Sequence, residues 1–221
     1  MDQLLIAVDV DGTLYDGEAV PAETEAALRA CRDHGDLLVI VTGRRWETLP
    51  EVVPSVLELF HCVIAEEGGV IVDVASGAVQ LLAPRVEPDL LAALRGAGVT
   101  ELDIGHVVVG APVEHFAAFA SARDTVGSTR HLVVNKLSVA LAPRGFNKAS
   151  GLRAAVDRLS AHGVPVVAIG DAANDLPMFA AATHPYAVAN SDRAVYDSGV
   201  PITQAKAGYG VAEVLRLYRP T

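Results

Sequence analysis

Three apolar runs in this chain are each followed within two residues by a polar side chain that can carry chemistry. The runs are Leu4–Val8, Leu37–Val41 and Val166–Ile169, and the polar residues are Asp9, Thr42 and Asp171. Short runs rich in Leu, Ile and Val, without polar alternation, are typical of parallel strands buried on both faces. Because helical patterns separate the runs, the sequence predicts an α/β fold, a mainly parallel sheet with helices on both faces.

The helices expected around this sheet have apolar residues at helical spacing and are bounded by Gly or Pro. They span Pro21–His34, Trp46–Leu59, Lys148–His162, Leu176–Ala182 and Val211–Tyr218. Pro50 and Pro54 are expected to shorten or kink the second of them. Cys62–Ala65 and Val70–Val74 flank a Gly-Gly pair and predict a hairpin, and Tyr186–Val188 predicts one more strand.

Residues 84–143 depart from this alternation. Their expected elements are helix Pro88–Arg95, strand Glu101–Val109 with a turn near Gly105, helix Pro112–Arg123, and strands His131–Asn135 and Leu137–Leu141. The order α-β-β-α-β-β predicts a small open-faced sheet with two helices. We therefore expect residues 84–143 to form a domain inserted into a larger one, which comprises residues 1–83 and 144–221.

Charge and composition restrict the partners. The chain of 221 residues has 17 Lys and Arg against 27 Asp and Glu, a net charge of −10, and its longest basic cluster is Arg44-Arg45. We therefore expect no nucleic acid as a partner, whereas a small anion that a metal and a few cations neutralise locally remains compatible. The chain has no apolar run near the ~18 residues of a membrane span, and its N-terminal residues do not resemble an export signal. We expect a cytoplasmic protein without a membrane partner, either a monomer or a homodimer, with Cys31 and Cys62 buried and reduced.

The stretch Asp9–Thr13 carries the most informative pattern. Asp9 and Asp11 are two residues apart and project to the same side if the chain is still extended, and Gly12 permits the turn that follows. An ionised Asp9 at the end of an apolar strand is costly without a cation, which favours a divalent metal. The alternatives are a pair of aspartates that caps a turn, or a calcium loop, for which the Gly comes too early.

Three more motifs follow a predicted strand or open a predicted helix. They are Thr42-Gly43-Arg44, Asn147-Lys148 and Gly170–Asp175 with its Asp171, Asn174 and Asp175. A hydroxyl beside exposed backbone N–H groups can hold a small anion, and carboxylates with an amide suit a hard cation. Taken singly, each has an ordinary alternative: a helix N-cap, a solvated lysine, and the acidic first turn of a helix.

In this order, the four motifs resemble those of the haloacid dehalogenase-like (HAD) phosphatases. The resemblance implies a Rossmann-like HAD core, and the insertion between the second and third motifs is similar to that family's type IIB cap. It further implies Mg²⁺ as cofactor and a small phosphorylated metabolite as substrate. The enzyme class implied is a phosphomonoester hydrolase that works through an aspartyl phosphate.

The resemblance also implies a role for each matching residue. Asp9 would be the nucleophile, and Asp11 the general acid and then the general base. Lys148 would pair with both the phosphate and Asp9, and Asn174 would orient the acidic loop on the phosphate side. The expected phosphate-binding residues are Thr42, Gly43, Arg44, Lys148 and Asn174. The expected metal ligands are Asp9, the backbone carbonyl of Asp11, Asp171 and Asp175.

Two positions differ from the pattern of the family. Ala149 follows the lysine where Gly is usual, and Glu66-Glu67-Gly68 stands where Glu-Asn-Gly is usual. We expect the second difference to alter cap contacts or substrate preference. The candidate cap contacts are His106, His115, Arg123, Arg130, Asn135 and Lys136.

Several substrates and two other function classes remain open at this stage. The short chain with its minimal cap most resembles phosphoglycolate phosphatases, and sugar-phosphate phosphatases acting on sucrose phosphate or mannosyl phosphoglycerate resemble it almost as well. A phosphomannomutase-like isomerase would need several cap arginines for a second phosphate. A non-catalytic phosphate-binding regulator would lack Asp9 or Asp11, and the chain has both.

Overall fold

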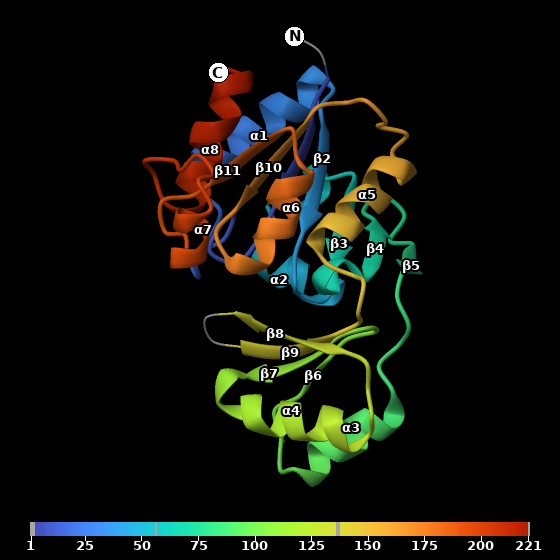
Figure 1. Ribbon diagram of the computed structural model, residues 1–221. Coiled ribbons are helices and arrows are strands. Elements are labelled where there is room, and N and C mark those ends of the chain that lie inside the picture. The colour runs from blue at the N-terminus through green and yellow to red at the C-terminus, as the bar shows by residue number, and fades with distance from the viewer. Residues whose placement is uncertain (1–2, 56, 136–137, 221) are drawn as a thin grey trace.

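Two separate sheets organise the chain, and they lie one above the other in Figure 1. The computed structural model describes residues 3–55, 57–135 and 138–220. The larger sheet has seven strands in the order β11-β10-β1-β2-β3-β4-β5, and the smaller has four in the order β6-β7-β9-β8. The predicted α/β fold is therefore confirmed, with a mainly parallel sheet and a smaller unit of order αββαββ.

The large sheet is parallel from β11 to β3, and β4 and β5 add an antiparallel edge. Its strands are β1 Leu5–Val8, β2 Leu37–Val41, β3 Cys62–Ala65, β4 Val70–Asp73, β5 Val79–Leu81, β10 Val166–Gly170 and β11 His184–Ala187. β1 pairs with β10 on one side and with β2 on the other. The carboxyl ends of β1, β2 and β10 therefore meet at one edge of the sheet.

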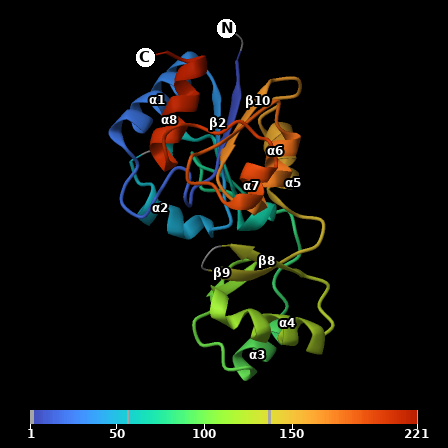
Figure 2. The same ribbon diagram turned by 60° about the vertical axis from the view of Figure 1, so that its left-hand side comes forward.

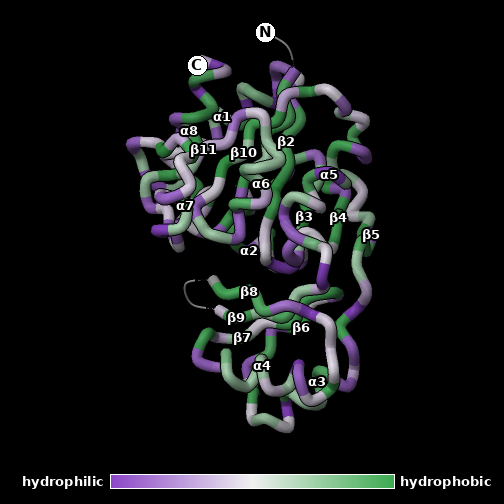
Figure 3. Tube along the Cα trace, in the orientation of Figure 1, coloured by the Kyte–Doolittle hydropathy of each residue, from purple (hydrophilic) through white to green (hydrophobic). Residues whose placement is uncertain are grey.

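Helices cover both faces of this sheet, as Figure 2 shows from a second direction. They are α1 Ala22–His34, α2 Leu49–Val52, α5 Lys148–Arg158, α6 Leu176–Ala181, α7 Arg193–Asp197 and α8 Ala207–Tyr218. Because side chains alternate along a strand, Ile6 and Val8 pack into the cluster with α1 and α8, while Leu5 and Ala7 pack into the cluster with α5 and α6. β2, β3 and β10 are buried on both faces almost throughout, which explains why they are mainly apolar (green in Figure 3).

The small sheet has its own apolar core and is the cap of the molecule. Its elements are α3 Pro88–Gly96, β6 Asp103–Ile104, β7 Val109–Pro112, α4 Phe116–Thr125, β8 His131–Asn135 and β9 Ser138–Ala142. Leu90, Phe119 and Leu141 belong to the cluster between the two helices and one sheet face. The opposite face is turned toward the carboxyl edge of the large sheet (Figure 1). The division at residues 84–143 stays a prediction, although β6 to β9 all come from that segment.

The structure corrects several predicted elements. The helix expected over Trp46–Leu59 is reduced to α2 and two 3₁₀ turns, Trp46–Thr48 and Leu57–Leu59. Pro50 lies in the first turn of α2, where its missing N–H costs nothing, and Pro54 follows the end of that helix. β5 and α7 were not predicted, because β5 is a short exposed edge strand and α7 is a five-residue helix.

The cap elements also shift from their predicted bounds. The strand expected over Glu101–Val109 is divided between β6 and β7, with a loop at residues 105–108. The helix expected from Pro112 begins as a 3₁₀ turn, Val113–His115, before α4. β9 begins at Ser138, and the predicted start at Leu137 lies outside the described residues. No helix in the described part of the chain is long and apolar enough to span a membrane.

Candidate active site

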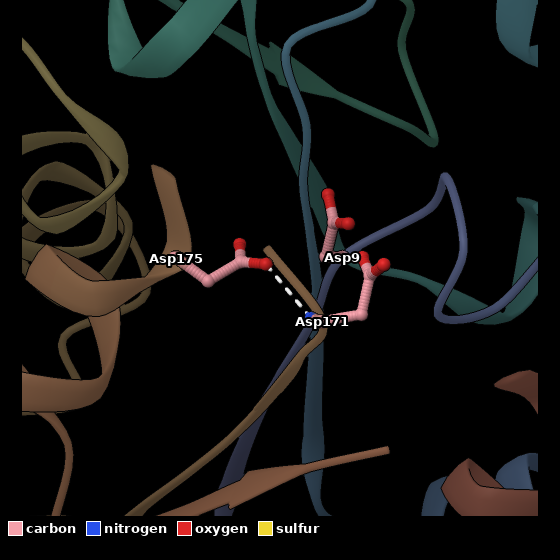
Figure 4. A group of neighbouring side chains, drawn as sticks. All are labelled: Asp9, Asp171 and Asp175. Carbon is pink, nitrogen blue, oxygen red and sulfur yellow. Dashed lines mark hydrogen bonds between the residues drawn. The ribbon is translucent and has the colours of Figure 1, made fainter. Parts of the chain in front are cut away.

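Three buried carboxylates lie together at the ends of β1 and β10. The side chains of Asp9, Asp171 and Asp175 contribute oxygens that all lie within 4.8 Å of one another (Figure 4). β1 and β10 position the first two, because Val8 is in register with Ile169 and the Asp9 N–H donates to the Ile169 carbonyl at 2.9 Å. Three hard oxygen donors with little exposure suit a divalent cation. The predicted ligand side chains therefore converge as a HAD metal site requires.

Lys148 balances part of this negative charge. Its Nζ donates to Asp9 Oδ1 at 2.7 Å and to Asp175 Oδ1 at 2.6 Å, and the side chain is 1% exposed. Lys148 opens α5, whose first turn is fixed by a reciprocal capping box between Asn147 and Ser150. The N-cap of α5 thus holds Lys148 at the sheet edge. Because its side chain is buried there, the alternative of a solvated lysine is excluded.

Burial disfavours the charged forms of both Asp9 and Lys148, but the net shift of each pKa is upward. The pKa of Asp9 lies well above its ordinary value, because burial disfavours the carboxylate more than Lys148 favours it, and the charges of Asp175 and Asp171 add to the upward shift. For Lys148, burial disfavours the ammonium, but Asp175 and Asp9 more than offset this and raise its pKa. A divalent cation in the cluster would favour the ionised form of Asp9. The donor set therefore fits a metal both chemically and electrostatically.

Asp175 also shapes the loop that carries Asp171. Its Oδ2 accepts from the N–H groups of Asp171 at 2.9 Å and Ala172 at 3.0 Å, the first of which is the dashed line in Figure 4. A Cβ at Gly170 would lie 2.5 Å from the Asp175 carboxyl carbon, so this approach requires glycine. Gly12, with φ of +80°, is needed for the same reason: a Cβ there would lie 2.4 Å from Asp171 Oδ2.

Asp11 lies outside the acidic cluster and is bound by Arg44. Arg44 donates from Nε to Asp11 Oδ2 at 2.7 Å and from Nη2 to Asp11 Oδ1 at 2.6 Å. The hydrogen bond to Asp11 raises the pKa of Arg44. Both side chains are about one-third exposed and line the cavity described below. Two of the predicted site residues therefore form a bidentate ion pair, which the sequence motifs did not suggest.

The second motif, Thr42-Gly43-Arg44, packs against the side chain of Glu67. Thr42 is buried, and its Oγ1 accepts from the Arg44 N–H at 3.1 Å. A Cβ at Gly43 would lie 2.4 Å from Glu67 Oε1, and Asn174 Nδ2 donates to that same oxygen at 3.1 Å. Burial raises the pKa of Glu67, although Lys148 and Asn174 oppose the shift. The residue that differs from the family pattern therefore lies between two predicted phosphate-binding residues.

Two asparagines at this edge have hydrogen-bonding features that the motifs did not predict. Asn174 Oδ1 is buried and, among the described residues, has no hydrogen-bond partner, so it is available to a bound group. Asn190 donates to the Gly12 carbonyl at 2.7 Å and accepts from the Ala207 N–H at 2.7 Å. It was missed, although its position shortly after β11, at the same sheet edge, was a usable signal.

A cavity of about 830 Å³ lies between this edge and the cap. Asp9, Asp11, Gly43, Arg44, Lys148 and Asn174 line it from the core. The cap contributes two acidic residues, Glu101 and Asp103, and otherwise small or apolar residues, namely Gly105, Val108, Gly110, Ala111, Pro112, Val133, Ser138, Val139 and Ala140. Of the predicted cap contacts, His106, His115, Arg123 and Arg130 do not line it. Asn135 belongs to β8, but its side chain is not described, and Lys136 lies outside the described residues.

The family follows from comparison with known proteins. Residues 6–91 and 114–215 match the family model of haloacid dehalogenase-like hydrolases. The chain belongs to this family. It is 28% identical to the phosphoglycolate phosphatase of Haloarcula marismortui over 97% of its own length and 96% of that protein. It is 26% identical to the 5-amino-6-(5-phospho-D-ribitylamino)uracil phosphatase YcsE of Bacillus subtilis over 98% and 96% of the two chains.

Solved structures of the family have the same fold. A HAD-like hydrolase from Bacteroides thetaiotaomicron superposes with a TM-score of 0.82 at 20% identity, over 98% of this chain and 99% of that one. SMU.1108c from Streptococcus mutans UA159 superposes with a TM-score of 0.77 at 15% identity, over the full length of both chains. The predicted HAD fold is thereby confirmed, and so is the prediction of a HAD-family phosphatase.

Proposed function

We propose that this HAD phosphatase hydrolyses small phosphomonoesters with Mg²⁺ through an aspartyl phosphate on Asp9. The observation that carries the proposal is the buried Asp9 carboxylate, held by Lys148 beside Asp171 and Asp175. A nucleophile that must approach a phosphate dianion needs positive charge around it, and Lys148 supplies part of that charge. Mg²⁺ held by Asp9, Asp171, Asp175 and the Asp11 carbonyl would supply the larger part of that charge.

In the first step, an Asp9 oxygen forms a bond to phosphorus as the bond between phosphorus and the leaving oxygen breaks. Asp11 gives its proton to that oxygen, which leaves as an alcohol. In the second step, Asp11 takes a proton from water, whose oxygen displaces Asp9 from phosphorus and releases inorganic phosphate. Thr42, Gly43 and Lys148 hold the transferring phosphoryl oxygens in both steps.

The Arg44–Asp11 ion pair requires substrate to bind before Asp11 can transfer a proton. While it is bound by Arg44, the Asp11 carboxylate accepts hydrogen bonds and has no proton to donate. We assign Arg44 to the substrate phosphate as well, so that the incoming dianion competes with Asp11 for the guanidinium. Substrate binding then releases the Asp11 carboxylate, which takes up a proton from solvent and donates that proton to the leaving oxygen.

Phosphoglycolate is the first candidate substrate. It is supported by the full-length similarity to two proteins named phosphoglycolate phosphatase, from Haloarcula marismortui and Methanothermobacter thermautotrophicus. The second candidate is a phosphorylated sugar or polyol, and the observation that favours it is the cavity of about 830 Å³, which is large for a two-carbon leaving group. An isomerase acting on a diphosphorylated sugar is disfavoured, because none of Arg85, Arg95, Arg123 and Arg130 lines the cavity.

Phosphate release from a panel of phosphomonoesters tests the proposal. The panel contains phosphoglycolate, glycerol 3-phosphate, ribitol 5-phosphate, glucose 6-phosphate and p-nitrophenyl phosphate, each with Mg²⁺ and with EDTA. We expect hydrolysis that requires Mg²⁺ and a preference for phosphoglycolate. Preference for the larger esters would support the second candidate, and full activity in EDTA would contradict the metal-dependent mechanism.

A further inference from the structure

Glu66 connects the cap to the second motif, Thr42-Gly43-Arg44, whose residues are proposed to bind phosphate. It is 1% exposed, and its carboxylate accepts three backbone N–H groups of the cap loop between β6 and β7. His106 donates to Oε1 at 3.0 Å, and Val107 and Val108 donate to Oε2 at 2.7 and 3.0 Å. A buried carboxylate is costly unless it is hydrogen-bonded in this way, so the loop and the carboxylate hold each other in place.

The backbone of Glu66 is bound to the core at the same time. Its N–H donates to the carbonyl of Arg44 at 3.0 Å, and the N–H of Glu67 donates to the carbonyl of Thr42 at 3.3 Å. Glu66 and Glu67 both have positive φ, 51° and 55°, a conformation that non-glycine residues rarely adopt unless their surroundings impose it. A single residue therefore joins the second motif, through its backbone, to the cap, through its side chain.

Packing at this junction leaves no room for displacement of the loop. Val107 and Val108 are buried in the apolar cluster of the large sheet, together with Val70 and Val72, although they belong to the cap. A Cβ at Gly105 would lie 2.5 Å from Glu66 Oε2. The loop at residues 105–108 is thus in direct contact with the core on its apolar side and with Glu66 on its polar side.

Arg130 completes the junction from the cap side. It is 3% exposed, and it donates to the carbonyl of Val107, to those of Pro84 at 3.1 Å and Arg85 at 2.8 Å, and to Glu87 at 2.6 Å. Residues 84–87 lead from the core into the cap, and the Val86 N–H donates to the His106 carbonyl at 3.0 Å. Arg130 therefore joins the connecting segment to the same loop that Glu66 binds.

We propose that Glu66 is a positioning residue. It fixes the position of the cap relative to the Thr42–Arg44 segment at the carboxyl edge of the large sheet, and so determines which leaving groups fit the cavity. The inference rests on the proposed function, because it assigns the specificity of that site. Val108, the last residue of the loop at residues 105–108, lines the cavity and leads into β7, so movement of the loop moves the cap wall of the cavity. Glu66 itself borders the cavity, but both of its carboxylate oxygens are bound by N–H groups of the cap loop, so in this proposal it acts through that wall.

Two variants disturb this junction by different routes. Glu66→Gln keeps the size of the side chain but turns an amide NH₂ toward backbone N–H groups, which cannot accept from it. Gly105→Ala removes no charge, but it pushes a methyl group into Oε2. Each has a matched control. Asp36→Asn removes another buried carboxylate, which accepts from the Leu4 N–H and from Arg219 away from the site. Gly96→Ala adds a methyl group to the cap where nothing lies within 4 Å.

The readouts are the ratio of kcat/KM for glucose 6-phosphate to that for phosphoglycolate, and hydrogen exchange of the amides of residues 105–109. In Glu66→Gln and Gly105→Ala we expect the ratio to change at least tenfold, mainly through KM, and these amides to exchange at least tenfold faster. In Asp36→Asn we expect a lower Tm but a ratio within twofold of the wild type. Gly96→Ala should match the wild type in both readouts.

The outcomes separate this proposal from the proposed function. Faster exchange with an unchanged ratio in both variants would overturn the specificity role of Glu66, and unchanged exchange would overturn the junction itself. A comparable change of the ratio in Asp36→Asn would also contradict the proposal, because it would reflect lost stability alone. Absence of hydrolysis by the wild type would overturn the proposed function and the specificity role together, while the exchange measurement would still decide whether Glu66 holds the cap loop.

Discussion

The two walls of the cavity differ in how their polar groups are used. On the core side, charged groups hold one another: Lys148 binds two carboxylates, Asp175 binds two backbone N–H groups, and Arg44 binds Asp11. On the cap side, the residues that line the cavity are mainly small or apolar, with Glu101 and Asp103 as the acidic ones. The buried charges at the junction with the cap, Glu66 and Arg130, bind mostly backbone groups. Under the proposed function, the mutually fixed charges of the core would supply reactivity, and the position of the cap wall would decide which leaving groups fit.

The strongest disruption of the core wall is Asp9→Asn. The amide is nearly isosteric but is a poor nucleophile and a weaker metal ligand, so kcat for p-nitrophenyl phosphate should fall by about 10³-fold or more. Circular dichroism serves as the control for folding. A variant that retains more than a tenth of the wild-type turnover would rule out the covalent mechanism.

Gly12→Ala tests how closely the core wall must pack. Its Cβ would displace the Asp171 carboxylate from the metal cluster, and misplacement of a catalytic group by about 1 Å can cost about 10²-fold, so we expect a loss of that size in kcat/KM. Gly163→Ala is the control, because Gly163 has nearly the same φ, +81° against +80°, but nothing within 4 Å. Equal losses in the two variants would mean that backbone strain, rather than contact with Asp171, is responsible.

Ala140→Leu alters the cap wall without touching a charge. Ala140 lines the cavity from β9, and the larger side chain should lower kcat/KM for glucose 6-phosphate about tenfold while leaving phosphoglycolate within threefold. Ala117→Leu on the exposed side of α4 should change neither value. If both esters lose activity equally, this part of the cap does not discriminate by size.

Glu67→Gln should produce the smallest change, in stability rather than turnover. Burial raises the pKa of Glu67 above its ordinary 4.5, so the folded protein keeps this proton at a pH where the unfolded chain has released it. As pH rises past 4.5, the wild type therefore loses stability until the pH exceeds the pKa in the folded state. Between pH 4.5 and 7.5 without divalent metal, the stability of the variant relative to that of the wild type should therefore increase in urea unfolding.

The control for that measurement is Asp73→Asn. Ser76 lowers the pKa of the exposed Asp73 below its ordinary 3.8, so the stability that its ionised form contributes is already present above that pH and is lost only below it. The difference between Asp73→Asn and the wild type should stay nearly constant from pH 4.5 to 7.5. A constant difference for Glu67→Gln as well would show that its carboxyl group titrates normally.

The core wall was predictable because parallel strands carry their ends to a common edge. Asp9, Thr42 and Asp171 each follow an apolar run, and once those runs are paired the residues converge whatever the loops do. Lys148 could be placed through its resemblance to the third motif, since a lone lysine in a sequence gives no sign of burial. The Arg44–Asp11 pair was not visible, because it depends on the side-chain directions at two loop positions.

The cap contacts were not predictable for a different reason. Cationic residues of the cap were expected to face the substrate, yet Arg130 is buried against the connecting segment and His106 pairs with Glu47. Bonds between a charged side chain and backbone carbonyls or N–H groups leave no periodic pattern in a sequence, so the partners of Arg130 and Glu66 could not be read from their neighbours. Of the pair Glu66-Glu67, only Glu67 departs from the family pattern, so no departure marked Glu66.

The order of the large sheet determines when a growing chain can complete its active site. β1 is central, yet its neighbour β10 comes late: Asp9 meets Lys148 across 139 positions of sequence, and Thr13 meets Asp171 across 158. Because the ribosome synthesises the chain from its N-terminus, one edge of β1 lacks its native partner β10 until the entire cap has been synthesised. The acidic cluster therefore cannot be complete until β10 has been synthesised, so catalytic competence is among the last properties that the nascent protein acquires.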